Sequence, residues 1–117
     1  WYRSFHIGSG VSLAAFVITH HNSALVSARW ARASETDWAW ASGAPEGLIY
    51  DSWNIRLLPH YAFGVFFVLS HLASGLRQIL IAHGIDAAIA NRIWVAGLIT
   101  SALGSATIIA ALIGARI

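Results

Sequence analysis

Histidines within apolar stretches are the residues of this chain whose types and spacing could do chemistry. His20 and His21 are adjacent in the segment FVITHHNSAL, and His71 lies in a second apolar run, HYAFGVFFVLSHLASG. An imidazole in lipid costs free energy unless its nitrogens find partners, so such residues face the bundle interior and are candidates for function. Two antiparallel helices, each with a histidine at comparable depth, offer one nitrogen each to the two faces of a haem iron. We therefore expect a haem b between His71 and either His20 or His21.

The choice between His20 and His21 stays open at this point. From the expected helix ends, His20 lies closer in depth to His71, whereas His21 shares a helical face with Gly10, eleven residues earlier. Gly75 lies one turn after His71 on the same face. Glycine at both positions leaves room for a flat macrocycle.

Charged and polar residues near the helix ends predict two further roles. Arg77 lies about 9 Å along the helix axis from His71, so we expect it to reach a haem propionate. His6 opens the first apolar segment and His83 ends the second, so we expect them on the same membrane surface, with Arg3 within reach. A quinone needs a hydrogen-bond donor at each carbonyl and a proton route to water, which this surface offers.

Three long apolar segments must position these residues. They cover about residues 5–28, 57–83 and 93–113. At about 1.5 Å per residue, each is long enough to cross a hydrocarbon core of roughly 30 Å. Only helices cross lipid as separate segments, because strands would leave backbone groups unpaired. We predict an all-α membrane protein in which residues 1–117 form a single transmembrane domain of three helices, part of a haem-binding bundle.

The two connections between these segments differ in kind. Residues 29–56 contain four of the five acidic residues, three arginines and four of the six tryptophans, which indicates an extramembrane loop with interfacial aromatics and room for a short helix. His60, after Pro59, is interpreted as interfacial. The connection GIDAAIAN is short, so the second and third helices are antiparallel neighbours. The third segment has small residues at helical spacing, which favour close packing: Gly97, Ser101, Gly104 and Ser105.

The composition excludes several classes of function. The chain is 57% hydrophobic and 10% charged, with a mean hydropathy of +0.64, which suits a lipid-embedded bundle. A net charge of +2 without a basic run argues against a nucleic-acid partner. There is no cysteine, so disulfides and thiolate ligands of iron–sulfur clusters are excluded within this chain. There is no methionine either, and we expect that the translated N-terminus precedes Trp1.

Two stretches, HIGSGVSLAAFVITHH and SHLASGLRQILIAHGI, resemble the membrane anchors of succinate dehydrogenases and fumarate reductases, the cytochrome b subunits of respiratory complex II. Residues 6–11 are similar to the His-Arg-x-Ser-Gly-Val run of the first helix in three-helix anchors. His71, Gly75 and Arg77 match the His-x-x-x-Gly-Ile-Arg run of their second helix, whose histidine is a haem ligand. FVITH and HLASGL also resemble ligand-bearing helices of five-helix anchors. This chain differs from the three-helix anchors in having Ile7 for an arginine, Arg3 for a quinone-site serine and His83 for an aspartate.

The resemblance implies a haem b-binding anchor subunit that passes electrons between an iron–sulfur subunit and a quinone and has no complete activity alone. It implies iron–sulfur and flavoprotein partners, and a location in a bacterial or mitochondrial inner membrane. Three-helix anchors take one haem ligand from a second membrane subunit, whereas we expect this chain to supply both ligands; a second membrane anchor stays open as a partner. In this chain the quinone candidates are His6, Ser9, His83 and Arg3. Two alternatives stay open, namely a subunit whose histidines each ligate a chlorophyll-type pigment, and a structural subunit whose histidines bridge helices.

Overall fold

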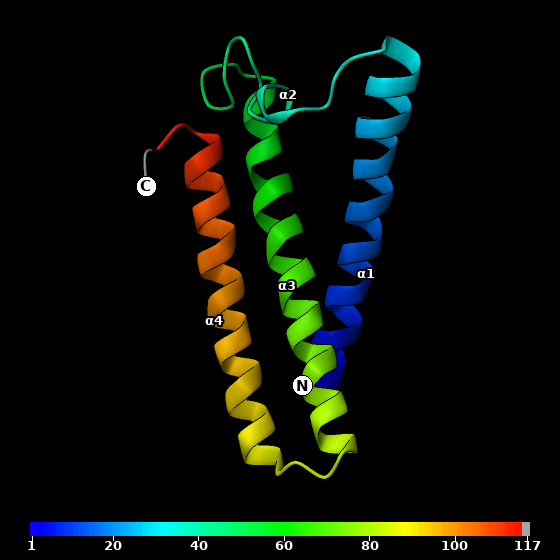
Figure 1. The fold of residues 1–117 in the computed structure, drawn as a ribbon, viewed down its shortest axis with the longest axis vertical. Coiled ribbons are helices and arrows are strands. Elements are labelled where there is room, and N and C mark those ends of the chain that lie inside the picture. Colours follow the sequence, from blue (N-terminus) through cyan, green and yellow to red (C-terminus); the bar gives the residue numbers. More distant parts are fainter. Residues whose placement is uncertain (116–117) are drawn as a thin grey trace.

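The computed structural model describes residues 1–115, and over these residues the chain is helical with no strand. Three long helices lie side by side, with α3 in the centre (Figure 1). The elements in chain order are α1 (Tyr2–His21), the π-helix η1 (Asn22–Trp30), α2 (Trp38–Ala41), the 3-10 turn η2 (Asn54–Arg56), α3 (Leu57–Ala82) and α4 (Ala87–Leu112).

All three long helical stretches have the length and composition needed to cross a membrane. They are Tyr2–Trp30, Asn54–Ala82 and Ala87–Leu112, and only 11 to 17% of the residues in their most apolar windows are buried inside the molecule. Most of the apolar side chains therefore face outward, which is the arrangement expected where lipid is the solvent. The three predicted spans are confirmed as helices, and they indicate a membrane protein.

The first and third helices begin earlier than predicted. α1 starts at Tyr2, and α4 starts at Ala87, six residues before the predicted start at residue 93. The carboxylate of Asp86 accepts hydrogen bonds from the backbone N–H groups of Ala88 (2.8 Å) and Ile89 (3.3 Å). This N-cap satisfies donors that a helix start leaves free, so the helix extends beyond the apolar segment itself.

The connection between η1 and η2 contains the short helix that the sequence allowed for. Asp37 caps α2 by accepting from the backbone N–H of Trp40 at 2.8 Å, and Asp51 accepts from the N–H groups of Trp53 and Asn54, both at 2.8 Å. Two of the four acidic side chains of this loop thus act as local caps.

Small residues let α4 approach α3 closely. A methyl group added to Gly97 would lie 2.5 Å from the Cβ of Ala73. The hydroxyl of Ser105 donates to the carbonyl oxygen of Ala62 at 2.7 Å, and the indole of Trp94 donates to Ser74 at 2.9 Å. The predicted small-residue seam is confirmed, and it faces α3.

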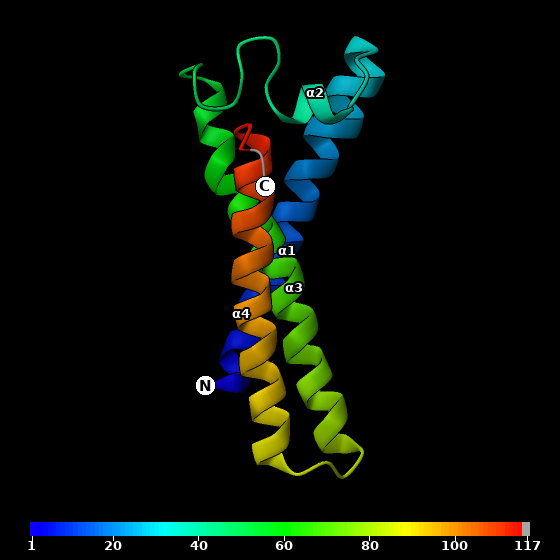
Figure 2. The same ribbon diagram turned by 60° about the vertical axis from the view of Figure 1, so that its left-hand side comes forward.

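The register between α1 and α3 decides which functional residues meet. Ser9 faces His71, Phe16 covers Gly64, and His20 approaches His60. In each of these pairs the two residue numbers add up to 80, as expected for one continuous antiparallel register. Gly64 leaves space for the ring of Phe16, because any side chain there would collide with it. From this contact α1 and α3 diverge towards the loop end (Figures 1 and 2).

Candidate functional site

His71 is held in one orientation by α1. Its Nδ1 lies 3.1 Å from the Oγ of Ser9, and the same hydroxyl donates to the carbonyl oxygen of His6 at 3.0 Å. Since the single hydroxyl proton goes to that carbonyl, Ser9 accepts from Nδ1–H of the imidazole. In a neutral imidazole this arrangement leaves Nε2 as the nitrogen that binds a metal. Ser9 is itself buried, with 3% of its surface exposed, so this hydrogen bond is shielded from water.

His6 stacks on His71. The two ring centres are 4.4 Å apart and the planes are 14° from parallel. Nδ1 of His6 is buried and has no hydrogen-bond partner among the described residues. A buried polar atom without a partner is rare in folded proteins and marks a place where a ligand, water or ion belongs.

Gly10 and Gly75 lie next to this histidine pair, whereas Gly10 was expected beside His21 and Gly75 beside His71. A methyl group on Gly10 would lie 3.0 Å from Cε1 of His71, and one on Gly75 would lie 3.9 Å from Cε1 of His6. Gly10 therefore permits the present position of His71, whereas a side chain on Gly75 would make an ordinary contact.

Arg77 is fixed one and a half turns along α3 from His71. Its Nε donates to the side-chain oxygen of Asn91 at 2.8 Å, and its guanidinium lies 3.7 Å from the ring centre of Tyr2. Tyr2 in turn meets Trp94 edge to face, with ring centres 4.9 Å apart. The remaining N–H donors of the guanidinium are available to an anionic group such as a propionate.

The structure does not bring His20 to His71. His20 is eleven residues beyond Ser9, the residue that faces His71, so the two histidines are separated by about 16 Å along the helix axis. The expected match in depth assumed that both helices end at the same two membrane surfaces. The register set by Phe16 and Gly64 shifts α1 towards the loop end instead. His21, the next residue along, is exposed.

His20 meets His60 at the loop end. Their ring centres are 6.3 Å apart, and the ring of Phe16 lies 5.6 Å from His20 and 4.6 Å from His60. His60 was expected at the membrane interface, without a partner. Only the register between the two helices reveals that these histidines face each other.

The same shift separates His6 from His83, which were expected on one membrane surface. His6 lies beside His71, whereas His83 is twelve residues further along α3, about 18 Å along the axis. Nδ1 of His83 lies 2.9 Å from the carbonyl oxygen of Ile79 and donates to it at the C-terminal end of α3. Arg3 is exposed near the start of α1.

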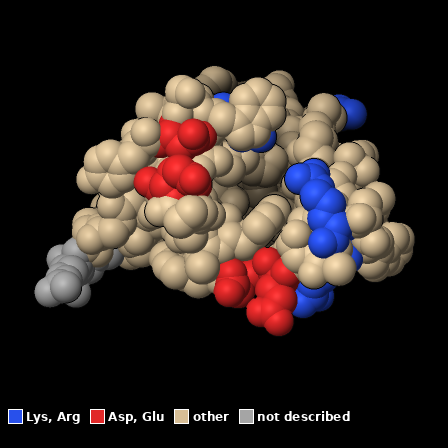
Figure 3. Space-filling view, turned by 90° about the horizontal axis from the view of Figure 1, so that it is seen from above, with Lys and Arg blue, Asp and Glu red and all other residues tan. Residues whose placement is uncertain are grey.

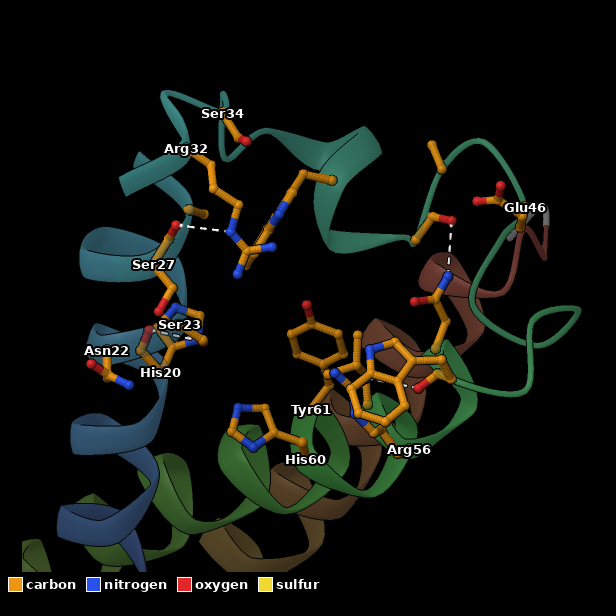
Figure 4. A pocket seen from close by; sticks show the side chains of 17 residues that line it. His20, Asn22, Ser23, Ser27, Arg32, Ser34, Glu46, Arg56, His60 and Tyr61 are labelled. Atoms are coloured by element: carbon orange, nitrogen blue, oxygen red, sulfur yellow. Dashed lines mark hydrogen bonds between the residues drawn. The ribbon is translucent and has the colours of Figure 1, made fainter. Parts of the chain in front are cut away.

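A polar cavity of about 420 Å³ lies at the loop end, where α1 and α3 diverge. Figure 4 shows His20 and His60 at its floor, Arg32 above them, just past the end of η1, and Tyr61 beside His60. Seen from this end, a hollow opens in the surface, with basic and acidic side chains at several points around it (Figure 3). Sequence reasoning missed this site, because its residues come from the second half of the first span, the loop and the start of the second span.

Within residues 1–115, no group of three or more His, Cys, Asp or Glu side chains is placed to hold a metal ion. Haem iron differs from such an ion because the porphyrin supplies four nitrogens, so the protein provides only axial ligands. Comparisons of the chain with protein-family models, with curated proteins and with solved structures find no match.

Proposed function

We propose that this chain is a haem b-binding membrane anchor subunit of a succinate:quinone oxidoreductase-like complex. His71 is the axial haem ligand that this chain provides. The observation that carries the proposal is the hydrogen-bond chain from Nδ1 of His71 through Ser9 to the carbonyl oxygen of His6. Histidine ligands of metals commonly donate their other ring N–H to a fixed acceptor, which orients the ring and sets its tautomer.

A second membrane subunit provides the opposite axial ligand in this proposal. His6 stacks directly on His71, with ring centres 4.4 Å apart. The other histidines lie about half the length of a helix from His71: His20, His21, His60 and His83. The imidazole of His71 is only partly buried, and its neighbours Leu72 and Leu76 are 64% and 45% exposed. A second subunit and the haem would have to reach His71 on the part of its side chain that α1 leaves uncovered. The resemblance to three-helix anchors supports the same division of ligands.

The residues around His71 suit a haem and a quinone side by side. Arg77 has donors left for a propionate, and the buried Nδ1 of His6 lacks a hydrogen-bond partner, which a quinone carbonyl would provide if it entered beside His6. A haem b bound here would supply one-electron transfer between the iron–sulfur subunit and the quinone. In that arrangement His71 holds the iron, Ser9 fixes the imidazole, and His6 donates a hydrogen bond to the quinone and carries a proton.

Reduced-minus-oxidised absorption spectra test this function. They are recorded on the complex purified through a tag on this chain, as wild type and as His71→Ala, His20→Ala and His21→Ala variants. We expect a b-type band that is lost in His71→Ala and retained in the other two. A wild-type complex without such a band, or a band that survives His71→Ala, would contradict the proposal. A red-absorbing chlorophyll spectrum would favour the pigment alternative instead.

A further inference from the structure

The cavity at the loop end has two arginines whose guanidiniums are held by backbone oxygens. Nε of Arg32 donates to the carbonyl oxygen of Ser27 at 3.2 Å, and Nη1 of Arg56 donates to that of Trp53 at 2.7 Å. The guanidinium of Arg56 also lies 3.9 Å from the ring centre of Trp53. Each arginine has five N–H donors, so each keeps most of them for a ligand. Planar forks of this kind bind phosphate through pairs of hydrogen bonds.

The charge of the cavity favours an anion. Arg32 and Arg56 line it together with His20 and His60, and the acid among the lining residues is Glu46. Figure 4 shows Glu46 on the loop, at the opposite side of the cavity from Arg32. The lining of the cavity therefore carries two arginines against one carboxylate.

An apolar groove of about 300 Å³ adjoins this cavity and shares His60 with it. The groove runs between α1 and α3 and is lined by Phe16, Phe63 and Phe67, with Ala15 and Thr19 from α1. It lies within the membrane-spanning part of both helices. The polar cavity lies at the end of the same spans, beside the exposed Trp30 and Trp53, which are 75% and 68% exposed. Exposed tryptophans at span ends are typical of the headgroup level of a bilayer.

A polar, cationic cavity at headgroup depth that continues into an apolar groove matches the two halves of one amphiphile. We propose that the loop end of α1 and α3 is a binding site for an anionic phospholipid. Its phosphate is bound by Arg32 and Arg56, and one acyl chain lies in the groove lined by Phe16, Phe63 and Phe67. The lipid fills the space that opens where α1 and α3 diverge, and it thereby holds η1 and the loop against α3. This site is separate from His71 and does not depend on the proposed haem.

Lipid retention in native mass spectrometry tests the headgroup half of the proposal. The full chain in mild detergent is titrated with phosphatidylglycerol or with phosphatidylcholine of identical acyl chains. We expect one phosphatidylglycerol to be retained at a concentration lower by about tenfold or more, because phosphatidylcholine has the same phosphate but adds a choline cation that the two arginines repel. The double variant Arg32→Gln/Arg56→Gln should lose this preference. The control Arg29→Gln removes one exposed charge of η1 outside the cavity and should keep it. Equal retention of both lipids by the wild type, or the same loss in the control, would overturn the proposal.

Two further experiments test whether the bound molecule is a phospholipid. Inorganic phosphate at millimolar concentration should not displace phosphatidylglycerol, because it gains nothing from the groove. Ala15→Leu fills the groove and should weaken retention, whereas Ala14→Leu, the exposed neighbour outside the groove, should not. Three outcomes would each refute a phospholipid as the occupant. They are displacement of the lipid by free phosphate, its displacement by a long-chain quinone, and equal retention in both leucine variants. Circular dichroism of each variant checks that its helix content is unchanged.

Discussion

Gly10→Ala and Gly8→Ala make the same chemical change two residues apart on α1, and we expect opposite results. A methyl group on Gly8 meets nothing within 4 Å, whereas one on Gly10 would lie 3.0 Å from Cε1 of His71. Alanine favours a helix over glycine by roughly 1 kcal/mol at either position. At Gly10 the added methyl group must displace the imidazole of His71. Such overpacking typically costs about 1–3 kcal/mol, which offsets the gain in helix stability. Gly8→Ala should therefore stabilise the chain, and Gly10→Ala should be neutral or destabilising.

Thermal unfolding in detergent, followed by tryptophan fluorescence and by far-ultraviolet circular dichroism, measures this difference. We expect the free energies of unfolding of the two variants to differ by about 1–3 kcal/mol, with Gly10→Ala the less stable. The haem content of the purified complex should fall in Gly10→Ala alone, because the same contact moves the proposed ligand. Equal shifts in stability, together with equal haem content, would refute the packing of Gly10 against His71.

Three further predictions test the contacts that position the site. Ser9→Ala should lower haem affinity, measured by haem titration, by about 10- to 100-fold, as is typical when the hydrogen-bond partner of a metal ligand is removed. The control Ser4→Ala, on the exposed side of α1, should leave the haem affinity unchanged. Trp94→Phe should lower the free energy of unfolding by about 1 kcal/mol through loss of its hydrogen bond to α3, and chemical denaturation that shows no change would contradict it. Asp86→Ala should cost about 0.5–2 kcal/mol and speed hydrogen exchange in the first turn of α4, and unchanged exchange there would show that the cap contributes nothing.

The sequence was sufficient to predict the helices and much of their packing. Apolar length predicted three spans, and small residues predicted the face of α4 that meets α3. The start of α4 was missed because hydropathy marks where lipid contact begins, whereas Asp86 decides where the helix begins. A capping signal at Asp86, followed by Ala-Ala-Ile-Ala, was the available clue.

The pairing of histidines was not predictable from the sequence because it depends on register. Contacts between histidines were expected on the assumption that α1 and α3 end at the same two membrane surfaces. The interlocking of Phe16 with Gly64 shifts α1 by about three turns relative to that assumption, so His71 meets Ser9 and His6, and His20 meets His60. Gly10 was expected to leave room for a macrocycle beside His21, but in the structure it lies against the ring of His71. The register depends on how the surfaces of two helices fit together, so no pattern within the sequence of one helix reveals it.

Rescue by free imidazole is the most direct test of His71 as the haem ligand. The complex with His71→Gly is purified with and without imidazole in the buffer, and the reduced-minus-oxidised spectrum is recorded for each sample. We predict that the variant lacks the b-type band without imidazole and regains it when imidazole occupies the vacated position, because Ser9 and Gly10 still shape that position. A His71→Gly complex that shows the full band without imidazole would contradict ligation by His71.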